Sequence, residues 1–297
     1  MKRAFQTDFG SSYEGKIEDF FRLNKFKKYQ GEIDLILTSP PYPLIRKKKY
    51  GNLNGDEYLE WFEHLASGFS DLLSPEGSIV IELGNTWNKG TPTMSTLTLR
   101  ALLAFLSAGS FHLCEQFVWY NSAKLPSPTE WVNKRRIRVK DAFTHIWWMS
   151  KSEFPKANNR NVLENYSPAM NRLIDEEETT RSIRPSEHVI NTKSFKKNNG
   201  GAIPSNVLVS GNTSNQPDYL SYCKGLDVLP HPARMPKTIP EFFINFLTDE
   251  GDLVLDPFGG SNTTGAVAES LSRRWLSVEP NEEYILGSMF HFDNLRK

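Results

Sequence analysis

The segment Ser39-Pro40-Pro41-Tyr42 carries groups that could hold an amino group on a flat ring. It follows Ile33–Thr38, a largely apolar run that is typical of a strand buried on both faces of a parallel sheet. Prolines lack an N–H and leave carbonyl acceptors, and the serine oxygen is a further acceptor. The tyrosine offers a face on which a planar ring can stack. Taken alone, the segment also fits a proline-rich turn with a packing tyrosine.

A second candidate site is the glycine-rich segment 256–265 (DPFGGSNTTG). It lies between a predicted strand and a predicted helix, where glycines allow close approach of a ligand and free N–H groups can bind a carboxylate. Glu279 follows about 20 residues later, a spacing that suits an acceptor for ribose hydroxyls. The segment lacks G-K-[ST] and departs from G-x-G-x-x-G, which disfavours ATP, GTP and dinucleotide sites. A tight turn without a ligand is the alternative.

These segments sit in a pattern of alternating strands and helices. The order indicates a doubly wound α/β sheet, in which ligands bind at the carboxyl ends of strands. Ser74-Pro75-Glu76-Gly77 is expected to close one helix as a turn. The predicted strands are 33–38, 78–83, 111–120, 142–149, 252–255 and 274–278, and the predicted helices are 56–73, 96–108, 239–247 and 263–271.

Composition narrows the class of protein. The chain has 297 residues and a formal net charge of zero, but its basic residues are clustered, and nucleic-acid binding depends on where charge lies. Cys114 and Cys223 are too few for a disulfide framework or a structural zinc site, so no metal is expected. No apolar run approaches the roughly 20 residues of a membrane span, and the N-terminus lacks a signal core. A cytoplasmic protein without a membrane partner is expected.

The stretch from Lys151 to Cys223 differs in character. It is rich in Asn, Ser, Lys, Glu and Pro, and its hydrophobic periodicity fades, although apolar residues persist through it. A disordered linker is one interpretation, and an irregular insert that contacts a partner is the other, which we favour. The predicted organisation is therefore one α/β domain, made of residues 1–150 and 226–297, interrupted by an insert at 151–225.

Three motifs resemble those of the amino-group DNA methyltransferases. Thr38–Tyr42 resembles their motif IV, residues 256–265 resemble the S-adenosylmethionine (AdoMet) loop, motif I, and residues 231–236 (HPARMP) resemble motif X. Motif IV precedes the other two, which is the order of the β group. Residues 124–128 and 130–136 closely resemble a methyltransferase of a type II restriction–modification system. Three motifs in this order are far more specific than any one of them.

The resemblance implies a Rossmann-like methyltransferase fold with a mixed, doubly wound sheet and an irregular target-recognition insert. It implies AdoMet as cofactor, double-stranded DNA as substrate and functional pairing with a restriction endonuclease. The serine before Pro-Pro favours cytosine N4 as the methylated atom, since N6-adenine enzymes more often have Asp or Asn there; N6-adenine is the alternative. C5-cytosine chemistry needs a cysteine nucleophile, and neither cysteine follows a proline at a strand end. A non-catalytic DNA-binding protein on the same scaffold and a Rossmann oxidoreductase are the remaining alternatives.

The resemblance also assigns roles to single residues. Because the target atom is inaccessible inside a duplex, the base is expected to flip out and stack on Tyr42. One departure is Lys16, which stands where many family members have an Asp near the cofactor. The catalytic residues are expected to be Ser39, Pro40, Pro41 and Tyr42, and the cofactor-binding residues Asp256, Phe258, Gly259, Gly260, Ser261, Glu279, His231 and Pro232.

Basic residues that flank these motifs are candidates for DNA contacts. Such side chains bind phosphates, and arginine can also read guanine through two hydrogen bonds. Arg181, Arg184 and Lys193 of the insert are candidate base readers. The predicted DNA-binding residues are Arg46, Lys47, Lys48, Lys134, Arg135, Arg136, Arg138, Arg184 and Lys193.

Overall fold

The computed structural model describes residues 1–43, 53, 55–175, 181–183, 189–191, 197–211 and 216–293. The chain divides into two compact units. The larger comprises Met1–Ala157 and Asn206–Lys297, and the smaller comprises Asn158–Ser205. The smaller unit falls inside the predicted insert 151–225, whereas the last part of that stretch belongs to the larger unit.

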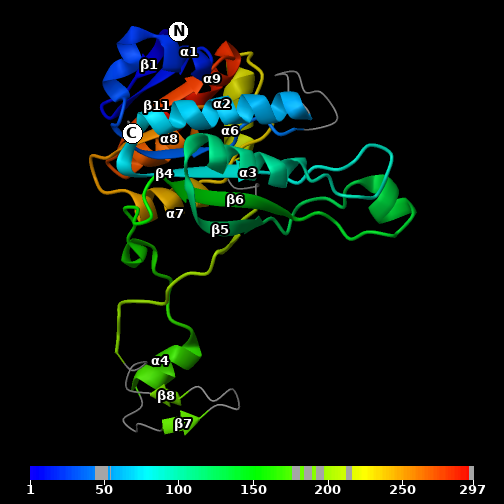
Figure 1. Cartoon of the computed structure of the whole chain (residues 1–297), viewed down its shortest axis with the longest axis vertical. Helices are drawn as coiled ribbons and strands as arrows, with labels where there is room; N and C mark the ends of the chain where they lie inside the picture. Colours follow the sequence, from blue (N-terminus) through cyan, green and yellow to red (C-terminus); the bar gives the residue numbers. More distant parts are fainter. Residues whose placement is uncertain are drawn as a thin grey trace. The chain divides into compact units, whose positions relative to one another are not determined.

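The larger unit is built on one mixed sheet, drawn in Figure 1. Among the described residues the sheet has nine strands in the order β1-β2-β11-β10-β3-β4-β6-β5-β9. Strands β2, β11, β10, β3 and β4 are parallel, and β6 runs antiparallel to β4. The strands are β1 (Lys2–Gln6), β2 (Gly10–Glu14), β3 (Ile33–Thr38), β4 (Leu73–Leu83), β5 (His112–Tyr120), β6 (Phe143–Ser150), β9 (Val207–Val209), β10 (Leu253–Asp256) and β11 (Arg274–Glu279).

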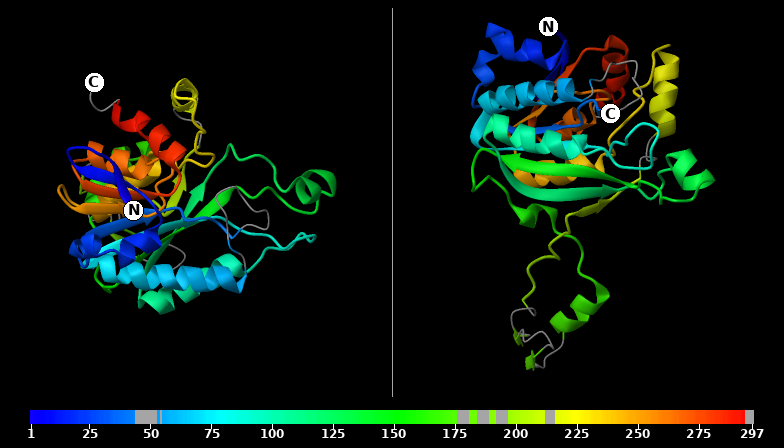
Figure 2. Two further views of the ribbon diagram at one scale, coloured as in Figure 1. Left: turned by 90° about the horizontal axis from the view of Figure 1, so that it is seen from above. Right: turned by 45° about the vertical axis from the view of Figure 1, so that its right-hand side comes forward.

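Helices cover both faces of the sheet, as Figure 2 shows. Strand β3 explains why: Ile36 belongs to a core cluster with residues of α2 and α3, while Leu35 and Leu37 belong to a second cluster with α7 and α8. A strand with apolar neighbours on both faces reads as a continuous apolar run. The predicted α/β class is confirmed. The helices are α1 (Ile17–Arg22), η1 (Asn24–Tyr29), α2 (Asp56–Leu72), α3 (Leu97–Gly109), η2 (Glu130–Lys134), α6 (Gln216–Gly225), α7 (Thr238–Leu247), α8 (Thr263–Ser270), α9 (Glu282–Ser288) and α10 (Phe290–Asp293).

Two local features differ from the sequence-based expectations. Residues Ser74–Gly77 do not form a separate turn, because they lie within β4. Leu73 pairs with Ile33 and Ser78 with Leu35, so these four residues form an irregularity between two paired positions. The N-terminal hairpin of β1 and β2 was not predicted, and β1 is mostly exposed, which leaves little hydrophobic pattern to detect.

The smaller unit has little regular structure. It contains η3 (Asn159–Val162), α4 (Pro168–Asp175) and the antiparallel pair β7 (Arg181–Ile183) and β8 (Val189–Asn191). A bridge between Glu164 and Ala202 joins its two ends. In the described part of the whole chain, no helix has both the length and the apolar character that a bilayer span requires.

Candidate active site

The two motif-bearing turns lie at the ends of neighbouring strands. Strand β3 pairs in parallel with β10, with Leu35 opposite Val254. At their carboxyl ends the hydroxyl of Thr38 donates a hydrogen bond of 2.8 Å to Oδ1 of Asp256. The Phe258 backbone N–H donates to the same oxygen at 3.1 Å. The two turns therefore meet on adjacent strands, and Asp256 links them directly.

A carboxylate on the next strand joins the two polar side chains of the Ser-Pro-Pro-Tyr turn. Ser39 Oγ donates a hydrogen bond of 2.5 Å to Oε2 of Glu82, and the Tyr42 hydroxyl donates to Oε1 of the same residue. Glu82 lies near the end of β4, which pairs with β3. Ser39 and Tyr42 are partly exposed, whereas Glu82 is only 3% exposed. Ser39 and Tyr42 are thus partly open to solvent, while a buried carboxylate holds both side chains in place.

Burial raises the pKa of Glu82, because a charged carboxylate loses hydration inside the sheet. Hydrogen bonds from Ser39, Tyr42 and Thr144 and the positive charge of Lys124 act in the opposite direction. Sequence reasoning missed Glu82. The available signal was a single carboxylate inside the apolar run Ile79–Leu83, which a buried strand does not tolerate without partners.

The ring of Tyr42 rests against a glycine. A Cβ on Gly84 would lie 2.5 Å from Tyr42 Cε2, far inside contact distance. Gly84 directly follows β4, so the strand that carries Glu82 also supplies the surface for the ring. The backbone at this position lies against the ring edge and the Glu82 carboxylate binds the hydroxyl, so two contacts fix the ring of Tyr42.

The glycine loop between β10 and α8 is bound to the end of β11. The Gly260 N–H donates to Glu279 Oε2 at 2.8 Å, and the Asn281 N–H donates to Oε1 at 2.9 Å. The Gly259 N–H donates to the Val278 carbonyl at 2.9 Å. Each carboxylate oxygen has two acceptor positions, so Glu279 is oriented by the backbone with capacity for further donors. Burial raises the pKa of Glu279.

The motif X segment, residues 231–236, packs against the same glycine loop. A Cβ on Gly260 would come within 3.0 Å of the His231 ring, and Gly260 has a φ of 52°, so both space and backbone require glycine. The His231 ring also packs edge-on to Tyr284, with centroids 4.8 Å apart. Burial lowers the pKa of His231 to about 4, which keeps the imidazole neutral near pH 7. The structure assigns no such contact to Pro232.

The segment around Lys16 borders the same edge of the sheet. Gly15 N–H donates to the Glu279 carbonyl at 3.1 Å, and Lys16 precedes α1 without a side-chain cap. Glu18, two residues later, accepts a hydrogen bond of 2.8 Å from Trp61 Nε1. Trp61 in turn packs edge-on to Phe258 of the glycine loop, with centroids 5.8 Å apart. Glu18 therefore supports the loop indirectly through Trp61, in the segment where Lys16 replaces the Asp that many family members have near the cofactor.

These features fit the expected AdoMet. Its ribose needs hydrogen-bond acceptors, which the Glu279 carboxylate supplies, and Gly259 and Gly260 let the loop pack closely against Ser277 and His231. Phe258 is partly exposed beside this loop and offers an apolar face. The residues present can thus hold a cofactor of this chemistry beside the Ser39 turn.

Four predicted DNA-binding residues lie on a projecting arm, residues 121–142 between β5 and β6, visible in both views of Figure 2. Glu130 pairs with Lys134 at 3.4 Å and with Arg135 at 3.1 Å. The Arg138 guanidinium stacks on the Trp87 ring, 3.1 Å from its centroid. Arg136 is exposed, and among the described residues it has no hydrogen bond or ion pair. The side chains of Arg46, Lys47, Lys48, Arg181, Arg184 and Lys193 lie outside the described residues.

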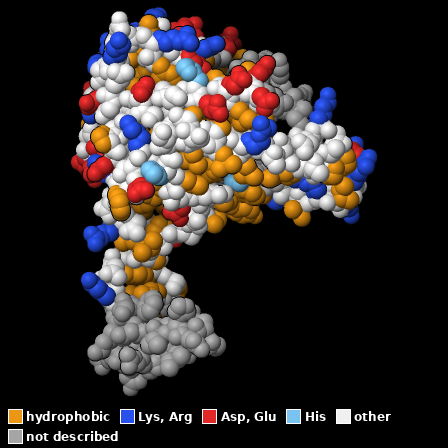
Figure 3. Space-filling view, viewed as in Figure 1, with side chains coloured by type: hydrophobic (Ala, Val, Ile, Leu, Met, Phe, Trp, Pro, Cys, Tyr) orange, Lys and Arg blue, Asp and Glu red, His pale blue; other side chains and the backbone are white. Residues whose placement is uncertain are grey.

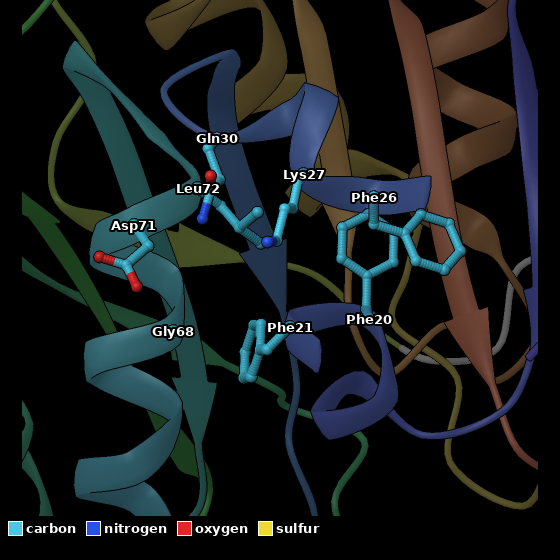
Figure 4. Close-up of a pocket in the computed structure, with 8 residues that line it drawn as sticks. All are labelled: Phe20, Phe21, Phe26, Lys27, Gln30, Gly68, Asp71 and Leu72. Carbon is cyan, nitrogen blue, oxygen red and sulfur yellow. The ribbon is translucent and has the colours of Figure 1, made fainter. Parts of the chain in front are cut away.

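A small cavity lies at the opposite edge of the sheet, shown in Figure 4. Its volume is about 20 Å³, enough for about one water molecule. It adjoins the amino ends of β3 and β4, where the Gly31 N–H binds the Asp71 carbonyl. Its size and position exclude it as the site of either the base or the cofactor. The lining residues are Phe20, Phe21, Phe26, Lys27, Gln30, Gly68, Asp71 and Leu72.

Comparisons with known proteins agree with this site. The family model N6_N4_Mtase, described as DNA methylase, matches residues 33–289. The type II methyltransferase M.PvuII of Proteus hauseri is 46% identical over 98% of this chain and 86% of its own length. The solved structure of the PvuII cytosine-N4-specific DNA methyltransferase superposes with a TM-score of 0.78 and 40% identity, covering 98% of this chain and 89% of that one.

A more distant structure supports the fold alone. A putative DNA modification methylase from Thermus thermophilus, complexed with S-adenosyl-L-methionine, superposes with a TM-score of 0.57 at 16% identity. It covers 95% of this chain and 93% of its own. The family model spans most of the chain, and M.PvuII is a relative over nearly its whole length. The chain therefore belongs to the DNA methylase family.

Proposed function

We propose that this protein transfers a methyl group from AdoMet to N4 of a cytosine in double-stranded DNA. The single observation that carries the proposal is the joining of Ser39, Tyr42 and Glu82 beside the glycine loop. The similarity to M.PvuII and to the PvuII cytosine-N4-specific enzyme supports the choice of cytosine.

The hydrogen bond to Glu82 gives Ser39 its role. When the Ser39 hydroxyl donates its hydrogen bond to the carboxylate, both lone pairs of Oγ remain as acceptors. An exocyclic amine can then donate to Oγ and to the Pro40 carbonyl. These bonds weaken conjugation of the nitrogen lone pair with the ring and direct that lone pair outward. Ser39 and Pro40 orient the amine, and Glu82 acts as a positioning residue that sets the direction of the hydroxyl.

Tyr42 holds the plane of the base. Its hydroxyl is fixed on Glu82 and its ring is fixed against Gly84, so the orientation of the ring is set before the base arrives. Pro41 lies between the amine-binding and stacking residues and restricts the backbone through its fixed φ. Preorganised stacking of this kind reduces the orientational freedom that must be lost before transfer.

Asp256, Phe258, Gly259, Gly260, Ser261 and Glu279 would hold AdoMet, with His231 packed against Gly260 and Pro232 next to it in sequence. When bound, AdoMet supplies an activated methyl on a positively charged sulfur. The chain then needs no covalent nucleophile of its own, and its residues act by orientation. The proton of the amine leaves after transfer or through water, because a serine hydroxyl is a poor base.

Double-stranded DNA is the proposed form of the DNA substrate. The amine lies inside the helix, so the base must leave the stack to reach Tyr42. Lys134, Arg135, Arg136 and Arg138 provide positive charge for the phosphates, as do Arg46, Lys47 and Lys48, with Arg184 and Lys193 as insert residues that contact DNA. Its biological role is protection of host DNA within a type II restriction–modification system, paired in function with an endonuclease.

Analysis of the modified base tests the proposal. The purified protein is incubated with AdoMet and unmodified genomic DNA, and the DNA is digested to nucleosides for mass spectrometry. N4-methylcytosine is expected, in amounts that depend on AdoMet. N6-methyladenine would keep the enzyme class and refute the base. Absence of both, with DNA binding retained, would indicate a non-catalytic DNA-binding protein.

A further inference from the structure

The arm at residues 121–142 exposes aliphatic side chains among its cations. Leu125 is 80% exposed and Val139 is 85% exposed, values high for residues of this kind. The arm holds six basic and two acidic residues, and Figure 3 shows both kinds of surface on this projection. Its charge complements a polyanion, and the aliphatic side chains exposed within this basic surface would suit a ligand that is itself partly apolar.

The root of the arm is held at the active site. Lys140 Nζ donates to the carbonyls of Ser122 at 3.0 Å and Lys124 at 3.4 Å, which keeps the two limbs together. Leu125 and Val139 are the sequence neighbours of Lys124 and Lys140, so each apolar residue lies next to this crosslink. The crosslink places both exposed side chains on the same part of the arm.

A hydrogen bond ties that part of the arm to the strand end that carries Glu82. The positive charge of Lys124 is also near enough to favour the charged form of the Glu82 carboxyl and so lower its pKa. Asp141, next to Lys140, accepts a hydrogen bond of 2.9 Å from Asn85, three residues after Glu82. The apolar pair is therefore close to where the target base must arrive, while the basic tip of the arm extends farther out.

We propose that Leu125 and Val139 enter the base stack of duplex DNA beside the target nucleotide and hold the target base outside the helix. This inference rests on the function proposed above. The stack of bases is the apolar part of a polyanionic duplex, and side chains of this type separate base steps in other DNA-binding proteins. The basic residues on either side of the pair bind phosphates, and these contacts limit how far the two side chains insert into the duplex.

The test compares paired and unpaired targets. The probe is a DNA duplex with the sequence at which the wild-type enzyme places its methyl group, with the target cytosine opposite guanine or opposite an abasic site. The Leu125→Ala/Val139→Ala double variant is expected to transfer methyl at least about tenfold more slowly on the paired duplex. On the abasic duplex its rate returns close to that of the wild type, because little unstacking is needed. Leu103→Ala, on α3 and 66% exposed, is the control and changes neither rate.

A second readout is independent of catalysis. Fluorescence of 2-aminopurine at the target position rises when that base leaves the stack, and the double variant is expected to give a smaller rise at saturating protein. The role of Leu125 and Val139 in the base stack would be refuted if the double variant lost the same rate on both duplexes, or if it kept the wild-type rates and fluorescence. Either result would leave the methyltransferase proposal intact. If the wild-type protein places no methyl group on any DNA, both proposals fail.

Discussion

Thr38 and Asp256 are 218 positions apart in the chain and share a hydrogen bond of 2.8 Å. Both are buried, Thr38 at the end of β3 and Asp256 at the end of β10. Burial raises the pKa of Asp256, while the bonds from Thr38 and from the Phe258 N–H favour its charged form. The contact fixes the amine-binding turn and the glycine loop in one frame, so the geometry of methyl transfer depends on it.

Thr38→Val is therefore expected to weaken AdoMet binding. It leaves a buried carboxylate with one donor fewer, which costs about 1–3 kcal/mol of stability. Isothermal titration with AdoMet and thermal unfolding measure the two effects. Thr248→Val is the control: its hydroxyl binds the Ile244 carbonyl, away from the glycine loop, and its loss should lower stability without changing AdoMet affinity. Equal effects of both variants on AdoMet affinity would contradict the role given to Thr38.

Activity is expected to fall at acid pH because of Glu82. Its pKa is raised above the usual 4.5 by burial, so protonation begins at a higher pH than for an exposed glutamate. Below that raised pKa the carboxyl carries a proton and can no longer accept from both Ser39 and Tyr42, so kcat should fall as pH decreases through it. Glu82→Gln has no charge to lose and accepts through one oxygen only, so its kcat should be low and flat over the same range. A pH profile that is unchanged by Glu82→Gln would refute this assignment.

Gly84→Ala tests the placement of the tyrosine ring. The added Cβ would meet Tyr42 Cε2 at 2.5 Å, so the ring must move from the position that stacks on the base. We expect kcat to fall about 100-fold, the scale of a misplacement of about 1 Å, with AdoMet affinity retained. Gly90→Ala is the control for a glycine in the following loop with open space around it, although its φ of 77° predicts a small loss of stability. Normal turnover by Gly84→Ala would show that ring position is unimportant.

We expect Arg136 to contact a DNA phosphate. It is exposed, its φ of 56° places it in the left-handed region, and it has no partner among the described residues. Arg136→Asn suits that backbone conformation and should weaken DNA binding at all sequences, reducing the slope of log K against log salt by about 1. Arg274→Asn, at the amino end of β11, should leave the slope unchanged. An unaltered slope for Arg136→Asn would remove this residue from the interface.

Sequence alone predicted the central sheet and the two turns that it positions. Strands such as Ile33–Thr38 are buried on both faces, and such burial requires an apolar run that is easy to detect. The exposed strand β1 carries no such run, and α6 has weak periodicity, so neither was predicted. The turn predicted at Ser74–Gly77 was wrong. A proline and a glycine two residues apart signal a break, but they do not show whether the break interrupts a strand or precedes one.

The site was predicted in part for a similar reason. The sequence singled out Ser39, Tyr42 and Glu279 as candidates, because they lie at or within four residues of predicted strand ends and in motifs that resemble those of the family. Glu82 was missed, since its contacts with Ser39 and Tyr42 depend on pairing of β3 with β4 and not on any neighbour in sequence. The support of Phe258 by Trp61 and Glu18 was missed because three separate segments build it.

Single-turnover transfer of labelled methyl from AdoMet to DNA by Ser39→Ala tests the central claim most directly. This variant is expected to bind AdoMet and DNA as the wild type does, while its transfer rate falls about 100-fold, because the amine loses its acceptor at Oγ. Transfer at the wild-type rate would contradict the account, since the Ser39 turn would then not orient the reacting nitrogen.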